Sequence, residues 1–62
     1  MNWSQKLEAA LDALSRSDLD RAYVLAKEVA DRFVFDNTIT YQQMRDAYGI
    51  LNWVLQERFA QG

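Results

Sequence analysis

The sequence predicts an all-α protein, a single helical domain over residues 1–62 that folds as a small three-helix bundle. Apolar residues recur at spacings of three and four in three segments, which is typical of helices with one buried face. Proline is absent and glycine occurs only at positions 49 and 62, so the chain has no turn-rich stretch. Short connections favour antiparallel neighbours. An alternative is a hairpin of the two longer helices that pairs with a second copy.

The first two helices are expected at about residues 3–15 and 18–34. The apolar face of the first consists of Trp3, Leu7, Ala10, Leu11 and Leu14. Ser17 followed by Asp20 matches a helix-start pattern, in which the serine hydroxyl accepts a hydrogen bond from a free amide. The apolar face of the second helix consists of Leu19, Ala22, Tyr23, Ala26, Val29, Ala30 and Phe33. On its outer side, Glu28 is placed to pair with Arg32 one turn later.

The third helix is expected at about residues 41–60. Asp36 and Asn37 favour a turn before it, because their short side chains bond to nearby backbone. Thr40 and Gln43 have the spacing of a capping box. The predicted inward residues are Met44, Ala47, Tyr48, Leu51, Val54, Leu55 and Phe59. Gly49 lies inside this helix, at a cost of up to about 1 kcal/mol relative to alanine.

One stretch, DLDRAYVLAKEVADRF, resembles the second helix of a tetratricopeptide repeat. It covers about a quarter of the chain. In that family, small residues in this helix allow two helices to pack closely. The resemblance implies ordinary helix-hairpin packing here, and it implies no binding residues.

The composition argues against catalysis, metal binding and cofactors. The chain has no cysteine and no histidine, which excludes disulfides, thiolate or imidazole ligands and nucleophiles of those types. Asp18 and Asp20 point to different sides of a helix and serve as helix-start charges. The segment DNTITYQQMRDA begins like a calcium loop, but it has Tyr41 at the sixth position and Ala47 at the twelfth. We therefore expect no enzyme, no metal and no cofactor.

The charges argue against nucleic-acid and membrane partners. Seven Lys and Arg residues against nine Asp and Glu residues give a net charge of -2, and the basic residues are scattered along the chain. A nucleic-acid binder needs a basic face, so we expect no direct binding to DNA or RNA. The N-terminal segment has charges among its apolar residues, unlike a signal peptide or a membrane span. The expected location is cytoplasmic.

Trp53 points to a contact surface on the third helix. It lies nearly opposite the predicted inward face, and Ile50 lies on the flank between them. Together with Val54 they make the helix apolar over too wide an arc for an ordinary surface helix. The first helix, a second copy or a different protein could cover this side. The residues expected to make protein contacts are Ile50, Trp53, Val54, Glu57 and Phe35.

These observations predict a small non-enzymatic protein-binding module or regulator that acts through an apolar face on the third helix. A homodimer is expected, because a chain of 62 residues hides only about 60% of the surface that its unfolded form exposes. An unidentified protein is the second expected partner. One alternative is an acidic inhibitor that uses Glu8, Asp12, Asp18 and Asp20 to occupy the basic groove of a nucleic-acid-handling protein. Another is a structural subunit of a larger assembly.

Overall fold

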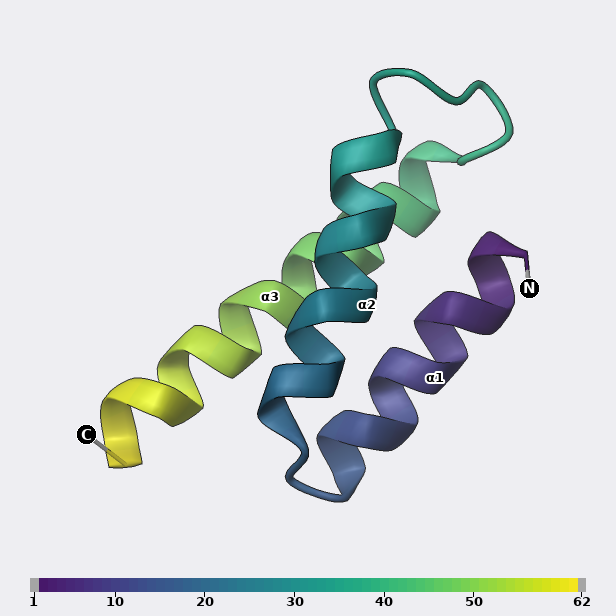
Figure 1. Ribbon diagram of the computed structural model, residues 1–62. Coiled ribbons are helices and arrows are strands. Elements are labelled where there is room, and N and C mark those ends of the chain that lie inside the picture. The colour runs from purple at the N-terminus through teal and green to yellow at the C-terminus, as the bar shows by residue number, and fades with distance from the viewer. Residues whose placement is uncertain (1, 62) are drawn as a thin grey trace.

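The computed structural model describes residues 2–61, with the backbone alone at Gln61. Within this range the chain forms three helices, α1 (Trp3–Ser15), α2 (Leu19–Arg32) and α3 (Tyr41–Gln61), and no strand. The helices run alternately up and down, so that α1 and α3 point in the same general direction (Figure 1). The predicted all-α three-helix bundle is therefore confirmed for the described residues. The dimer stays a prediction.

The beginning of α1 is fixed by a capping box that the sequence reading did not single out. The backbone amide of Gln5 donates to the Asn2 side chain at 2.8 Å, and the amide of Asn2 donates back to the Gln5 side chain at 2.9 Å. Two of the amides that have no partner within the helix are thus satisfied. The helix spans residues 3–15, as predicted.

The turn between α1 and α2 differs from the prediction by one residue. Asp18, and not Ser17, is the N-terminal cap of α2, since its carboxylate accepts from the amide of Arg21 at 3.4 Å. Ser17 instead closes α1. Its φ of 61° lies in the left-handed region, and its amide donates to the carbonyl of Leu14 while that of Asp18 donates to the carbonyl of Ala13. This is the Schellman arrangement, in which glycine is the usual residue.

The loop between α2 and α3 is held by Trp3 from the start of α1. The indole Nε1 of Trp3 lies 3.2 Å from a carboxylate oxygen of Asp36 and 3.0 Å from the hydroxyl of Thr38, and donates to both. The amide and hydroxyl of Thr38 donate to the other oxygen of Asp36, at 2.8 and 2.6 Å. The predicted turn at Asp36 is confirmed, and a tryptophan from another helix fastens it.

The capping box predicted at the start of α3 is confirmed. The amide of Gln43 donates to the Thr40 hydroxyl at 3.1 Å, and the amide of Thr40 donates to the Gln43 side chain at 2.9 Å. The amide group of Gln43 also donates to the Ser4 hydroxyl at 2.8 Å, which ties the first turn of α3 to the first turn of α1. These contacts hold the upper ends of the two helices together.

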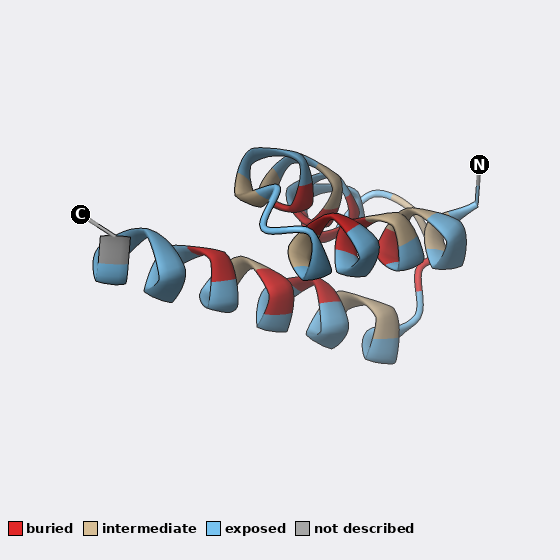
Figure 2. Ribbon diagram, turned by 90° about the horizontal axis from the view of Figure 1, so that it is seen from below, coloured by how far each residue is buried: buried red, intermediate tan, exposed pale blue. Residues whose placement is uncertain are grey.

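The core is built mainly from small residues, and α2 lies at its centre. Among the residues that the structure describes, six of the eleven buried apolar residues are alanine. The largest side chains with no accessible surface are Val29 and Val54. Small side chains let helices approach closely, and α2 packs extensively against both α1 and α3 (Figure 2). The contact between α1 and α3 is much smaller.

The inward face of α3 is rotated relative to the prediction, which is confirmed only in part. Ala47 and Val54 are buried as predicted and Ile50 is buried with them, whereas Tyr48, Leu55 and Phe59 are exposed. The buried face is rotated toward Ile50 because the small side chain of Ala47 and the branched ones of Ile50 and Val54 fit against α2. The bulkier residues are left on the flank. Two smaller predictions also fail: Leu11 is exposed, and Glu28 forms an ion pair with Lys6 of α1 instead of Arg32.

We expect Ser17→Gly to stabilise the protein. A non-glycine residue in the left-handed region costs about 1–2 kcal/mol, which glycine avoids. Glycine also loses more conformational entropy on folding, and this loss offsets part of the stabilisation. The free energy of unfolding should rise by about 0.5–1 kcal/mol in urea denaturation. Ser17→Ala, which keeps a Cβ at this position, is the control and should bring no gain. A Ser17→Gly variant no more stable than the wild type would contradict the assignment of the turn.

We expect Asp36 to contribute to the pH dependence of stability. The hydrogen bonds from the Thr38 hydroxyl and amide, followed by that from Trp3 and the charge of Arg32, hold the pKa of Asp36 below its ordinary value of 3.8. The contribution is therefore full above about pH 3.8 and is lost as the pH falls through the lower folded-state pKa. The difference in unfolding free energy between the wild type and Asp36→Asn should shrink on acidification. A constant difference between pH 7 and pH 2 would contradict this role.

Candidate functional site

An open apolar groove runs between α1 and α3 on the side away from α2. Its volume is about 680 Å³, within the range of volumes typical of ligand-binding pockets. Its walls are formed by Leu7, Leu11, Leu14 and Ser15 of α1 and by Arg45, Asp46, Gly49, Ile50 and Trp53 of α3. The groove exists because α1 and α3 each pack on α2 and contact each other little.

Two large apolar side chains on the walls of this groove are open to solvent. Leu11 exposes 53% of its surface and Trp53 exposes 57%. They come from opposite walls, so α1 does reach the side of α3 on which Trp53 lies, but it covers the indole only in part. Of the three elements that could cover Trp53, the first helix does lie beside it but leaves more than half of its surface exposed.

Gly49 forms an open part of the α3 wall. A Cβ added there would meet no atom within 4 Å outside its own helical backbone and neighbours. Among the described residues, no atom of another element lies within this distance of that Cβ, so internal packing gives no reason for a glycine in the middle of the helix. The absence of a side chain here leaves room in the groove.

The five predicted contact residues are divided by the structure. Ile50 and Val54 are buried in the core of the chain itself, although Ile50 also forms part of the groove wall. Trp53 and Glu57 are exposed on α3. Phe35 is exposed in the loop before α3, about three helical turns from Trp53 along the molecule. Hence the structure brings Trp53 and Ile50 together at the groove and keeps Phe35 apart from them.

A second apolar surface, most of which was predicted to face inward, lies on the outer side of α3. We call it the outer strip; it consists of Tyr41, Tyr48, Leu55 and Phe59, which expose 65, 55, 49 and 87% of their surfaces. Residues seven apart are two turns apart, so these side chains share one face. Leu55 and Trp53 are two residues apart and point to nearly opposite sides of the helix. The outer strip and the groove are therefore separate surfaces.

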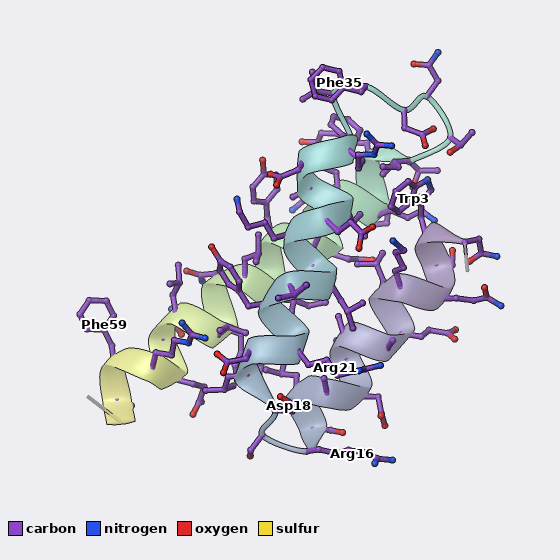
Figure 3. The ribbon with its side chains drawn as sticks, in the orientation of Figure 1. Trp3, Arg16, Asp18, Arg21, Phe35 and Phe59 are labelled. Atoms are coloured by element: carbon purple, nitrogen blue, oxygen red, sulfur yellow. The ribbon has the colours of Figure 1, made fainter. Side chains whose placement is uncertain are left out.

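The two ends of the molecule each carry an exposed phenylalanine. Phe35 projects from the α2–α3 loop at one end, and Phe59 projects from the last turns of α3 at the other (Figure 3). The last turns of α3 extend beyond the α1–α2 turn. They are held to α2 by Arg58, which forms an ion pair with Asp20 and lies 5.7 Å from the ring centre of Tyr23.

The acidic residues of the first two helices do not gather into one unpaired cluster. Asp12 forms an ion pair with Arg16 at 3.2 Å, Asp20 pairs with Arg58, and Asp18 caps α2. Figure 3 shows Arg16 and Asp18 at the α1–α2 turn. Glu8 takes part in none of the ion pairs found between residues 2 and 60. Within residues 2–60, no three acidic side chains are placed to hold a metal ion together.

Neither the apolar character of the helices nor similarity to known proteins assigns a function. Between residues 2 and 61, no helix combines the length and the apolar character needed to cross a bilayer. Comparison of the chain with protein-family models, curated proteins and solved structures finds no match. The functional argument therefore depends on the two apolar surfaces of α3.

Proposed function

We propose that this chain is a small, non-enzymatic protein-binding module that holds an amphipathic helix of another protein in the α1–α3 groove. The observation that carries the proposal is the distribution of apolar side chains. Alanine fills most of the core, while Trp53 and Leu11 stay open on facing walls of a groove. Tryptophan is enriched at the energetic centres of protein interfaces, and an apolar groove left open to water is a site for a partner.

The chemistry of the walls favours a helix over an extended peptide. Both walls are α-helices, whose backbone groups are already bonded within each helix. An extended peptide would bring unpaired amides and carbonyls against apolar side chains, which is costly. A helix satisfies its own backbone and presents apolar residues at spacings of three and four. In the groove it would complete a four-helix arrangement with α1, α2 and α3.

The charges around the groove indicate what should flank the apolar stripe of the bound helix. Asp46 lines the groove and accepts a hydrogen bond from Gln42 at 3.0 Å, and Glu8 lies on the exposed side of α1. A basic residue beside the stripe would complement these acids. Arg45 lies on the same wall, so the electrostatic contribution is mixed and small. The affinity is expected to come mainly from apolar contact.

The paired acids weaken the case for an inhibitor that imitates nucleic acid. Such a protein needs a dense, unpaired negative surface, whereas Asp12 and Asp20 are each neutralised by an arginine. Salt separates the two functions. Binding of a helix in an apolar groove should change little between about 0.05 and 0.5 M salt, whereas occupation of a basic groove should weaken steeply. The cytoplasmic location stays a prediction.

The test uses a phage-displayed library of amphipathic helical peptides with randomised apolar positions, selected against the wild-type chain. Selected peptides should carry bulky apolar residues at i, i+3 or i+4, and i+7. Gly49→Leu places a large side chain in the groove and should weaken their binding at least roughly tenfold, as expected for an interface hot spot. In a ¹H–¹⁵N NMR titration, the indole signal of Trp53 should shift. That of Trp3, whose indole is bonded to Asp36 and Thr38, should not.

Gly49→Ala is the matched control for this experiment. Its single methyl group enters open space, so the variant should bind the peptides more tightly than Gly49→Leu does. It should also be more stable than the wild type by up to about 1 kcal/mol, since alanine favours the helix. Peptides that bind Gly49→Leu as tightly as the wild type, or that leave the Trp53 signal unshifted, would contradict the groove as the binding site.

A further inference from the structure

The outer strip of α3 carries an inference that is independent of the groove. Its four residues project from a helix of 21 residues, which is longer than either α1 or α2. At a rise of about 1.5 Å per residue α3 is roughly 31 Å long. It thus spans most of the 36 Å long axis of the molecule. The exposed aromatic residues Tyr41 and Phe59 lie near its two ends.

We infer that the outer strip is the interface of a homodimer, in which α3 packs antiparallel against α3 of a second copy around a two-fold axis beside residue 50. Asn52 lies on the same face as the strip, and Arg45, which also lines the groove, lies at the edge of this face. The face therefore has residues at positions 41, 45, 48, 52, 55 and 59, spaced 4, 3, 4, 3 and 4 apart. This order of spacings reads the same in both directions.

The symmetry of the spacing makes the face complementary to itself in the antiparallel direction. A two-fold axis beside residue 50 places Tyr41 opposite Phe59 of the second copy, so that two aromatic rings meet at each end. It places Tyr48 opposite Asn52 of the second copy, within the reach of a hydroxyl and an amide. In a two-fold interface every contact occurs twice: where residue i of one copy touches residue j of the other, residue j of the first copy touches residue i of the second.

The charges favour this direction over a parallel one. Arg45 is the one charged residue on the face, and the antiparallel arrangement places it opposite Leu55 of the second copy. The two arginines would then be ten residues apart along the helices, roughly 15 Å, which is beyond the Debye length of about 10 Å at 0.1 M salt. A parallel pair would set Arg45 against Arg45. The antiparallel dimer therefore avoids the repulsion of like charges.

The area available is close to what a stable dimer needs. A large aromatic side chain can bury about 150–250 Å². With at least half of each ring exposed, the three aromatic residues and Leu55 offer roughly 400–500 Å² per copy. Two copies and their flanking residues approach the ~1,000 Å² at which specific interfaces begin. Interfaces at this lower limit of size are typical of weak, transient complexes. We therefore expect a dissociation constant between about 1 μM and 1 mM.

The first test is the mass of the wild type and of Leu55→Lys by light scattering across a concentration series. The wild type should change from monomer to dimer, and Leu55→Lys should raise the dissociation constant at least roughly tenfold, because a charge would face the second copy. Phe59→Lys is a second variant, at a residue so exposed that its replacement leaves the core untouched. Val24→Lys is the matched control: the exposed fraction of Val24, 62%, lies between those of Leu55 and Phe59, but Val24 is on α2 and not on the strip, so this variant should dimerise as the wild type does.

The second test measures the direction of the helices. The chain has no cysteine, so Ala60→Cys takes a single spin label at an exposed position off the strip. The antiparallel dimer predicts a distance of roughly 30 Å between the two labels, whereas a parallel dimer predicts roughly 10 Å. A wild type that stays monomeric up to about 1 mM, the weak end of the affinity range, would overturn the inference. So would dimers of Leu55→Lys and Phe59→Lys as tight as the wild type, or the short distance. Gly49→Leu should dimerise normally, which separates this interface from the groove.

Discussion

The whole structure depends on the close packing of both outer helices against the small residues of α2. Ala22, Ala26 and Ala30 give α2 a face on which neighbouring helices can lie close together, with Val29 filling the centre. An alanine side chain is a single methyl group and buries little apolar area. Each Å² buried contributes only about 25 cal/mol. Much of the order of the bundle must therefore come from its ends. The caps at Asn2, Asp18 and Thr40 are each worth about 0.5–2 kcal/mol, and Trp3 fastens the α2–α3 loop.

The same constraint explains why the chain has two open apolar surfaces. A central helix with a narrow face of small residues holds two neighbours but does not bring them together, so a groove remains between α1 and α3. Between residues 2 and 61, no other helix covers the outer side of α3. The large side chains that would fill the core of a bigger protein therefore lie outside, with Trp53 at the groove and Tyr48 on the outer strip. A dimer through the strip would present two grooves.

Local features were predictable from the sequence, whereas the rotation of α3 was not. The bounds of α1, the inward face of α2 and the Thr40 capping box depend on neighbouring residues, and all three are confirmed. In α3, large apolar residues surround most of the helix, so periodicity cannot choose between two faces. Tertiary packing buried Ile50 together with Ala47 and Val54 and left Tyr48 exposed. The capping role of Asp18 was missed since Ser17 is used to end α1.

The candidate site was predictable only in part for the same reason. The sequence marked Trp53 as off the main stripe, and the structure leaves 57% of its surface exposed. The groove required knowledge that α1 and α3 diverge, which no local pattern contains. Leu11 was assigned to the core because it lies at a core spacing, and Gly49 has no side chain whose environment could be inferred. Tyr48, Leu55 and Phe59 of the outer strip were recognised as part of one stripe but were expected to face inward.

The central claim is that α3 has two separate apolar surfaces, one left open beside α1 and one covered by a second copy. Hydroxyl-radical footprinting with mass spectrometry, performed below and above the dimerisation concentration, tests both at once. Tyr48 and Phe59 should become protected as the concentration rises, while Trp53 should react equally at both concentrations. Protection of Trp53 in step with Tyr48, or no protection of the outer strip at any concentration, would contradict the account.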